Sequence, residues 1–409
     1  MNALAAPATP KTKLEKRDLT LGLVPLNDCA PIAVGVEKGF FADQGLNVTT
    51  TREGSWAGIR DQVAFGLLDG AQMLATMPIC TTLGLGGFQC DMTYGVTLGL
   101  NGNAITLASW LCDEIDATAR PLQPHGKNTA DGLADVIRRR ASRGEAPLRL
   151  GAVFPMSTHE LELRYWLAAA GIDPARDVEI VVVPPPRMVE ALRAGELAGF
   201  CVGEPWNSLA VAEGLGRVAI TKHALWTNGP EKVLGVTAAW ADQHPGTHVA
   251  LIAALIEAGR WLDQPGNRAE ACEILSLPQY VGVEPSLIRS AMTGSFRTAA
   301  DADPVVTPDF HVFHRHDANV PWRSQALWWL TQMHRWGQVE MPYEAQLALS
   351  RIVRDDLFAQ AADRLGLPTP DAPDKLEDTE AFFDGRRFDP AVIDLNDLPN
   401  PNPQALTRH

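Results

Sequence analysis

Short apolar runs alternate with longer stretches of helical periodicity from about residue 18 onward. The runs predict strands at 19–24, 48–51, 71–74 and 92–98, and the stretches between them predict helices at 31–44, 57–67 and 79–85. An alternation of this kind builds a largely parallel sheet covered by helices. The first hundred residues therefore predict an α/β fold.

The same alternation resumes after a polar surface segment at 113–128. It predicts helices at 129–142, at 159–170 and up to Ala194, and strands at 148–153, 178–183, 198–202 and 233–238. Long helices follow at 243–262 and 324–336. The tail from Pro368 on predicts an extended wrap, with Phe382 and Phe383 tucked onto the body.

Two sets of strand and helix units indicate two lobes, and the chain crosses between them near 100–103 and near 231–234. We expect a disordered tail at 1–17, a first lobe built from 18–100 and 235–409, and a second lobe built from 101–234. Small ligands in such folds bind at the carboxyl ends of strands. The cleft between the lobes is therefore where a site is predicted.

The charge and composition of the chain disfavour several classes of function. There are 35 Lys and Arg against 49 Asp and Glu, a formal charge of −14, which disfavours direct binding of nucleic acid or an anionic membrane. Six scattered cysteines predict no metal or redox cluster. The opening Ala/Pro/Thr stretch lacks the apolar core of a signal peptide, and no long apolar run follows. We expect a cytoplasmic protein without membrane insertion.

Four segments at predicted strand ends carry candidate chemistry. Trp56 opens a helix, Gly102 and Asn103 lie at the first crossing, His159 falls in the first turn of a helix, and Lys232 lies at the return crossing. Helix starts offer free N–H groups, and each of these side chains except glycine adds a donor. Taken singly, each residue has an ordinary alternative: a packed aromatic ring, a turn, a surface histidine or a solvated lysine.

Other motifs do not point to an enzyme. His311, His314 and His316 are spaced like metal ligands, but no cysteine or carboxylate completes a tetrahedron, so a hydrogen-bonded loop is predicted there. Phosphate-binding loops, nucleophile elbows and zinc-protease helices are absent from the sequence. We expect a binding protein with no enzymatic activity.

Several strings taken together carry a family resemblance over residues 18 to about 390. They are PIAVGVEKGFFA from Pro31, WAGIRD from Trp56, NGNAI from Asn101, TH from Thr158, YWLAAAGIDP from Tyr165, PPP from Pro184, GEPW from Gly203 and PEK from Pro230. In combination they resemble the nitrate/bicarbonate-binding proteins of ABC importers. The resemblance implies a two-lobed periplasmic-binding-protein fold of type II, with the ligand clamped between the lobes.

The resemblance also implies a ligand set of Trp56, Gly102, Asn103, His159 and Lys232. Importers often have Gln in place of Asn103. Nitrate and nitrite accept hydrogen bonds only, so a ring of donors and one positive charge suits them. Relatives that bind bicarbonate have Glu in the lysine's place. The alignment of PEK puts Lys232 in the pocket and Glu231 outside, so we expect nitrate or nitrite, with no cofactor, metal or bound calcium. Lys232→Ala is expected to weaken binding severely while the fold survives.

The N-terminus departs from exported relatives and resembles the cytoplasmic nitrate-sensor branch. That branch implies a partner, an RNA-binding antiterminator of the ANTAR class, which the anion-bound sensor releases to switch on nitrate-assimilation genes. The acidic surface would suit a basic partner. Two alternatives stay open: the binding component of a nitrate or, less favoured, bicarbonate importer, and an enzyme similar to thiamine-precursor synthases.

Overall fold

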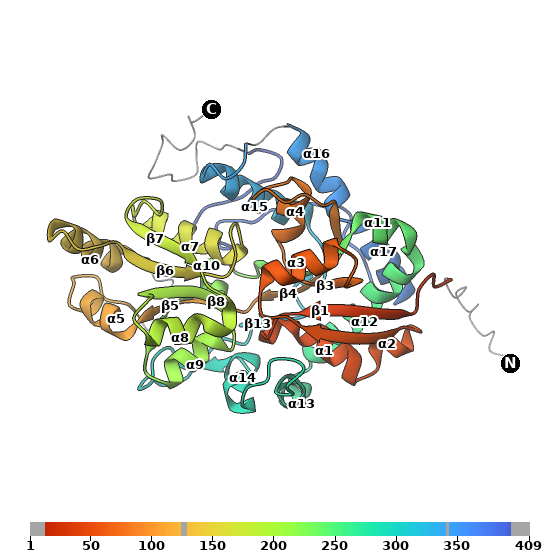
Figure 1. The fold of residues 1–409 in the computed structure, drawn as a ribbon, viewed down its shortest axis with the longest axis horizontal. Coiled ribbons are helices and arrows are strands. Elements are labelled where there is room, and N and C mark those ends of the chain that lie inside the picture. The colour runs from red at the N-terminus through yellow and green to blue at the C-terminus, as the bar shows by residue number, and fades with distance from the viewer. Residues whose placement is uncertain (1–12, 124–128, 341–342, 394–409) are drawn as a thin grey trace.

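Two mixed β-sheets organise the chain in a computed structural model that describes residues 13–123, 129–340 and 343–393 (Figure 1). The first sheet has the strand order β13-β4-β10-β3-β1-β2 and the second has the order β7-β6-β8-β5-β9. The predicted α/β class with two sheets is confirmed.

The first sheet contains β1 (Asp18–Leu23), β2 (Asn47–Arg52), β3 (Gly70–Leu74), β4 (Met92–Asn101), β10 (Pro230–Thr237) and β13 (His311–Val312). The second contains β5 (Asn103–Ala108), β6 (Leu148–Ala152), β7 (Val178–Val182), β8 (Gly199–Gly203) and β9 (Gly216–Thr221), while β11 (Ser295–Phe296) and β12 (Val305–Val306) pair separately.

The helices of the first part of the chain are α1 (Ala30–Glu37), α2 (Phe40–Asp43), α3 (Trp56–Ala64), α4 (Met77–Thr82), α5 (Ser109–Asp116), α6 (Asp131–Ser142), α7 (Thr158–Ala169), α8 (Met188–Arg193), α9 (Trp206–Ala212) and α10 (Lys222–Leu225). Those of the second part are α11 (Ala238–Gln243), α12 (Pro245–Leu262), α13 (Arg268–Leu275), α14 (Pro285–Met292), α15 (Arg323–Arg335), α16 (Tyr343–Ile352) and α17 (Asp355–Arg364). Single turns η1 (Asn27–Cys29), η2 (Pro185–Arg187) and η3 (Pro265–Asn267) connect some of them. Within these described ranges, we find no helix with the length and hydropathy of a membrane span.

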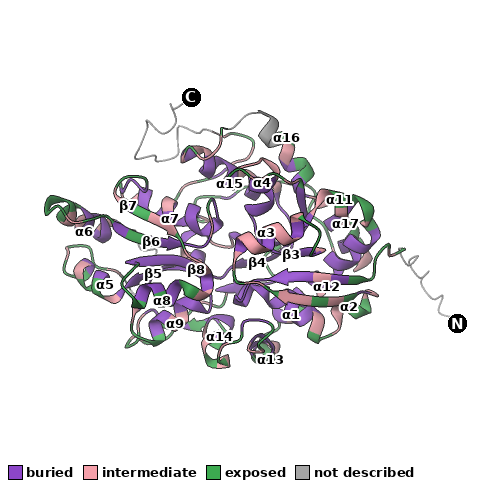
Figure 2. Ribbon diagram, in the orientation of Figure 1, coloured by how far each residue is buried: buried purple, intermediate pink, exposed green. Residues whose placement is uncertain are grey.

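Strand β10 lies in the middle of the first sheet, antiparallel to β3 on one side and to β4 on the other. All of its residues except the last are buried (Figure 2). A strand in this position is covered on both faces, so consecutive residues are buried although they point to opposite sides of the sheet.

The chain passes from the first sheet to the second at Gly102, between β4 and β5, and returns between α10 and β10. Gly102 has a φ of +85°, a left-handed conformation that favours glycine. β10 joins the first sheet from Pro230, ahead of the predicted lobe boundary at 235. The lobe boundaries themselves stay a prediction.

Two helix predictions differ from the structure, and two strands of the second sheet were not predicted. The helix predicted at 31–44 is two helices separated at Gly39, whose φ is +80°, and the helix predicted at 243–262 is divided before Pro245. Strands β5 and β9 were not predicted. Their sequences, NAITLA and GRVAIT, do not show a strict alternation of polar and apolar residues.

The two ends of the described chain are held on the body. The carboxylate of Glu15 accepts hydrogen bonds from the backbone N–H and hydroxyl of Thr247, so the predicted disordered tail is wrong for 13–17, while 1–12 lie outside the described residues. Near the other end, Phe382 is buried and its backbone pairs with Trp226, which confirms the predicted wrap.

Candidate functional site

Helix α3 brings Trp56 to the carboxyl end of the first sheet. The helix begins there because the Ser55 hydroxyl accepts a hydrogen bond from the backbone N–H of Gly58, at 3.2 Å. The Trp56 side chain is buried, and its indole Nε1 has no hydrogen-bond partner in the described chain. The Lys232 ammonium lies 5.4 Å from the centre of the Trp56 ring. A donor and a cation predicted from distant segments therefore meet.

Lys232 is completely buried and lies between two carboxylates. Its Nζ atom is 2.7 Å from Asp28 and 2.8 Å from Glu231. Burial alone would lower the pKa of Lys232, but the charges of Asp28 and Glu231 outweigh it, so the pKa lies above its usual value. An ammonium group has three N–H donors. Two of them face these carboxylates, which leaves one for a ligand.

The prediction that Glu231 lies outside the pocket is wrong. Its side chain is 1% exposed, and its Oε1 atom lies close to three neighbours: Thr158 Oγ1, Lys232 Nζ and His159 Nδ1, the last at 3.5 Å. That prediction rested only on the alignment of PEK with the motif of the nitrate binders. Because β10 is covered on both faces, both residues are buried.

Glu231 also pairs with a second buried lysine, Lys222, which in turn pairs with Glu162. Lys222 Nζ is 2.5 Å from both Glu162 and Glu231, and it also donates to the carbonyl of Pro230 at 2.7 Å. Burial raises the pKa of Glu162 to about 7, although Lys222 lowers it. The amide of Asn103 lies beside Glu162 and lowers the same pKa, but no hydrogen bond of normal geometry joins them.

His159 is the second residue of α7, which the Ser157 hydroxyl caps by accepting from the backbone N–H of Glu160 at 3.1 Å. The imidazole is fully buried, with Nδ1 3.2 Å from Thr158 Oγ1, while Nε2 has no partner among the described residues. Burial lowers the pKa of His159 to about 3, against the opposing effect of Glu231. His159 is therefore neutral at pH 7.

Gly102 and Asn103 lie at the crossing between the sheets. Asn103 is fully buried at the start of β5, opposite Gly203 of β8. A Cβ atom on Gly203 would lie 3.3 Å from the amide oxygen of Asn103 and 3.5 Å from Asp28. Asn103 and the Asp28–Lys232 pair thus border the same place. A Cβ atom on Gly102 would lie 2.4 Å from the His311 ring, so only glycine fits there.

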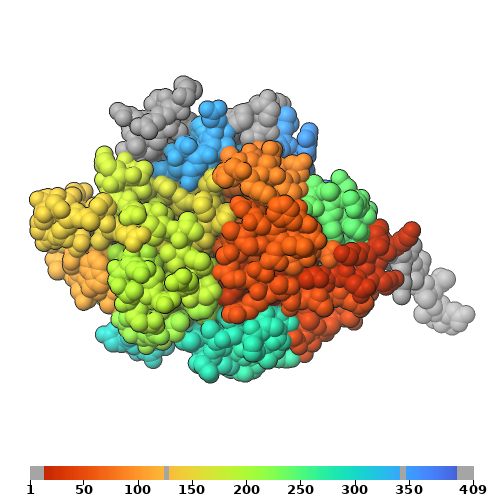
Figure 3. All heavy atoms as spheres, in the orientation of Figure 1, coloured from red at the N-terminus to blue at the C-terminus, as the bar shows by residue number. Residues whose placement is uncertain are grey.

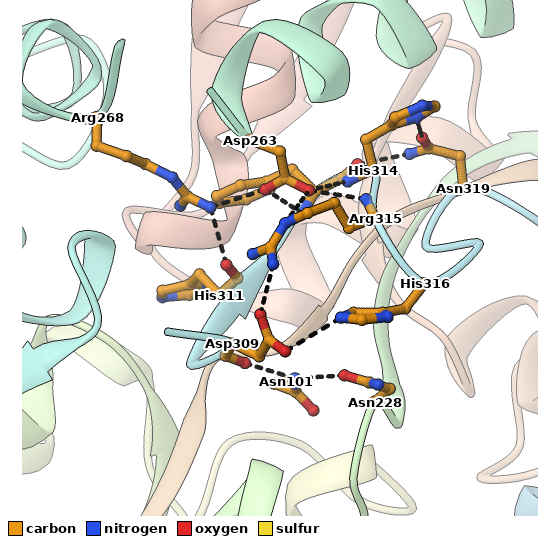
Figure 4. Close-up of polar contacts among 11 residues, drawn as sticks. Asn101, Asn228, Asp263, Arg268, Asp309, His311, His314, Arg315, His316 and Asn319 are labelled. Atoms are coloured by element: carbon orange, nitrogen blue, oxygen red, sulfur yellow. Dashed lines mark hydrogen bonds and ion pairs between the residues drawn. The ribbon is translucent and has the colours of Figure 1, made fainter. Parts of the chain in front are cut away.

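The loop that contains His311, His314 and His316 packs against this crossing and is held by hydrogen bonds (Figure 4). Asp263 accepts from the backbone N–H groups of residues 313–315 and pairs with Arg268 at 2.7 Å, and Asn101 donates to the carbonyl of Asp309 at 2.7 Å. His314 bonds Asn319 and His316 bonds Asp309. Within the described ranges no group of three potential ligands could hold a metal ion. The loop is hydrogen-bonded, as predicted.

The ends of the two sheets are in direct contact around these residues. The backbone N–H of Asn27 donates to the carbonyl of Glu204 at 2.8 Å, which joins the end of β1 to the end of β8. In Figure 3 the orange-red and yellow-green parts of the surface abut at the centre of the view. The candidate residues are therefore enclosed at this junction.

Three buried partners of the proposed ligand residues were not predicted from sequence: Asp28, Glu162 and Lys222. Asp28 lies in the η1 turn that follows β1, so the strand-end argument that selected Trp56 could have found it. Lys222 directly follows β9, a strand that was not predicted, and Glu162 lies within α7, so neither carried such a signal in the sequence. The two side chains meet only through tertiary packing.

Comparisons with known proteins agree with this architecture. Residues 12–276 match the NMT1-like family. The bicarbonate transport ATP-binding protein CmpC of Synechocystis is 41% identical over 95% of the chain, and the chain spans 56% of that protein, about half the length of the first curated relatives it matches. The nitrate/nitrite binding protein NrtA of Synechococcus elongatus is 35% identical over 92% of this chain and 84% of its own.

A solved structure shows the same fold. The periplasmic nitrate-binding protein NrtA of Synechocystis superimposes with a TM-score of 0.85 at 32% identity, over 92% of this chain and 97% of that one. The fold and the site together define a two-lobed substrate-binding protein of type II, as the sequence predicted. The chain belongs to the NMT1-like family and, within it, to the NrtA-type binding proteins. Since substrate-binding proteins are not enzymes, the prediction of a non-enzymatic protein is confirmed.

Proposed function

We propose that this protein binds a small monovalent oxoanion, nitrate or nitrite, between its two sheets. The observation that carries the proposal is the buried indole N–H of Trp56, which has no partner in the described structure and whose ring lies 5.4 Å from the Lys232 ammonium. A buried donor without a partner costs about 1–3 kcal/mol, and an anion would remove that cost. The name of the NrtA relatives supports the same ligand.

The proposed ligand set is Trp56, Gly102, Asn103, His159 and Lys232, as the family resemblance implied. These residues come from α3, β5, α7, β10 and the crossing, so binding would hold the two sheets together. The test is isothermal titration calorimetry with sodium nitrate and sodium nitrite. We expect saturable binding of one anion per chain, and the absence of heat with both salts would refute the proposal.

Hydrogencarbonate is the second candidate ligand. The name of the CmpC relative, a bicarbonate transport protein, supports this ligand. The Asp28 and Glu231 carboxylates beside Lys232 also support it, because the O–H of hydrogencarbonate needs an acceptor. The same titration with sodium hydrogencarbonate, at equal ionic strength, compares the affinities of the protein for nitrate and hydrogencarbonate. Tighter binding of nitrate supports the first candidate, and tighter binding of hydrogencarbonate would replace it.

A role in anion import comes first among cellular functions, because the CmpC relative is named as a bicarbonate transport protein. The sensor role with an ANTAR-type antiterminator stays a prediction from the resemblance. Purification of the protein from its native host distinguishes them. A membrane permease in the complex supports import, whereas an antiterminator that dissociates when nitrate is added would establish the sensor.

A further inference from the structure

The surroundings of His159 determine which ring nitrogen carries its proton. The Thr158 hydroxyl lies 2.5 Å from Glu231 Oε1, and a carboxylate can only accept, so the hydroxyl proton points to Glu231. Nδ1 of His159 then faces two acceptors, the Thr158 oxygen at 3.2 Å and Glu231 Oε1 at 3.5 Å. Nδ1 therefore carries the proton of the neutral ring, and Nε2 presents a lone pair.

This tautomer conflicts with a nitrate or nitrite ligand. Both anions offer lone pairs only, so an oxygen placed on Nε2 of the neutral ring would meet another lone pair. Nε2 is nevertheless a buried atom without a partner in the described structure. One additional proton on Nε2 would turn this repulsion into a charge-assisted hydrogen bond.

The charge of the cluster also bears on this. Asp28, Glu162 and Glu231 carry three negative charges when all are ionised, and Lys222 and Lys232 carry two positive charges, so the fully ionised cluster has a net charge of −1. Burial raises the pKa of Asp28 and that of Glu162, the latter to about 7, so Glu162 competes with His159 for a proton near pH 7. All five side chains are buried, with little solvent to screen them. A second negative charge in this place favours the uptake of a proton.

We propose that nitrate or nitrite binding protonates His159 at Nε2, so that an imidazolium is held between Glu231 and the anion. The inference rests on the proposed function. The solvent supplies the proton, and no other bond changes. Hydrogencarbonate carries its own O–H, which can donate to the lone pair of neutral His159, so its binding needs no proton.

In the free protein, some of the groups that face His159 stabilise its positively charged imidazolium form and others destabilise it. Glu231 of β10 favours the imidazolium, while Lys232 of the same strand and Lys222 of α10 oppose it. Thr158 and Glu162 come from its own helix. In the free protein, burial holds the pKa of His159 near 3. A bound anion on the opposite side of the ring from Glu231 places the imidazolium between two negative charges, which raises the pKa.

Calorimetry in two buffers tests the proposal. Nitrate is titrated into the full chain at pH 7 in phosphate and in Tris, whose ionisation enthalpies differ, and the difference in heat gives the number of protons taken up. We expect about one proton per nitrate, about none per hydrogencarbonate, and a nitrate Kd that rises about tenfold per pH unit between pH 6 and 8. Nitrate binding without proton uptake would overturn this inference but not the proposed function.

Two variants identify the group that carries the proton. His159→Gln offers an amide donor that needs no protonation, so nitrate binding should lose its dependence on pH. Glu162→Gln, one helical turn away, is the matched control and should keep the proton uptake. Uptake that vanishes in Glu162→Gln would assign the proton to Glu162 and overturn the proposal. If His159→Gln does not bind nitrate, ¹⁵N spectra of the wild-type imidazoles decide, because nitrate must convert Nε2 of His159 to its protonated form.

Discussion

The Nζ atom of Lys232 lies 2.7 Å from a carboxylate oxygen of Asp28, and both side chains are buried. This ion pair joins the middle strand of the first sheet to the turn that follows β1. Lys232 is therefore more than a candidate ligand. It is also the counter-ion of two carboxylates, Asp28 and Glu231, that have little contact with solvent.

Removal of the Lys232 charge should affect both binding and stability. Lys232→Met keeps the length of the side chain but leaves Asp28 and Glu231 without their partner, so we expect a loss of about 3–5 kcal/mol of unfolding free energy as well as a large rise in the nitrate Kd. This differs from the expectation, drawn from sequence, that Lys232→Ala spares the fold. Urea denaturation measures the loss.

A double variant separates the two effects. Asp28→Asn combined with Lys232→Met removes one carboxylate together with the cation, so it should recover part of the stability without recovering nitrate binding. An unchanged stability in Lys232→Met would show that the buried pair contributes little.

Trp56→Phe tests the indole donor. The Trp56 N–H makes no hydrogen bond in the described chain, so its removal should lower stability only through packing, whereas the nitrate Kd should rise about 10- to 100-fold because a bond to a charged ligand is lost. Trp322→Phe is the control, because Trp322 is also buried but packs near Lys375, in another part of the fold. Equal effects of the two variants on Kd would contradict the assignment.

Gly102→Ala should destabilise the crossing strongly. The new Cβ would lie 2.4 Å from the His311 ring on a backbone with φ +85°, so both a clash and backbone strain oppose it. Gly144→Ala is the matched control, since Gly144 also has a positive φ, +71°, but no atom within 4 Å of a new Cβ. We expect about 1 kcal/mol for the control and at least about 3 kcal/mol for Gly102→Ala. Thermal unfolding compares them, and equal losses would refute the clash.

Acid should destabilise the protein through its buried histidines. Burial lowers the pKa of His159, His248 and His311 to about 3, whereas an unfolded histidine has a value near 6.5. Between these values the unfolded chain binds protons that the folded chain does not, so stability present above pH 6.5 is lost as the pH falls toward 3.

Each of these histidines contributes about 1.4 kcal/mol per pH unit in that window. His248 is distant from the candidate site, packed beside Trp240. His248→Gln should therefore reduce the dependence of unfolding free energy on pH by about 1.4 kcal/mol per unit between pH 6 and 4. Denaturation curves at these pH values measure it, and parallel curves for the variant and the wild type would contradict the shifted pKa.

The fold and part of the site could be predicted from sequence because both rest on local patterns. The start of a helix, such as α3 at Trp56 with its Ser55 cap, can be recognised from a few neighbouring residues in the sequence. The same holds for a crossing between the sheets, such as that at Gly102. The position of Glu231 could not be predicted, because it depends on whether β10 is covered on one face or both. The pair of Lys222 and Glu162 requires the tertiary fold, since α10 and α7 meet only through packing.

The proposed anion site can be tested by a crystal structure of the protein grown in the presence of sodium nitrate. We expect one planar anion within hydrogen-bond distance of Trp56 Nε1, His159 Nε2 and Lys232 Nζ, with the Asp28–Lys232 pair intact. Nitrate bound elsewhere on the chain, with this site free of anion at a saturating concentration, would contradict it.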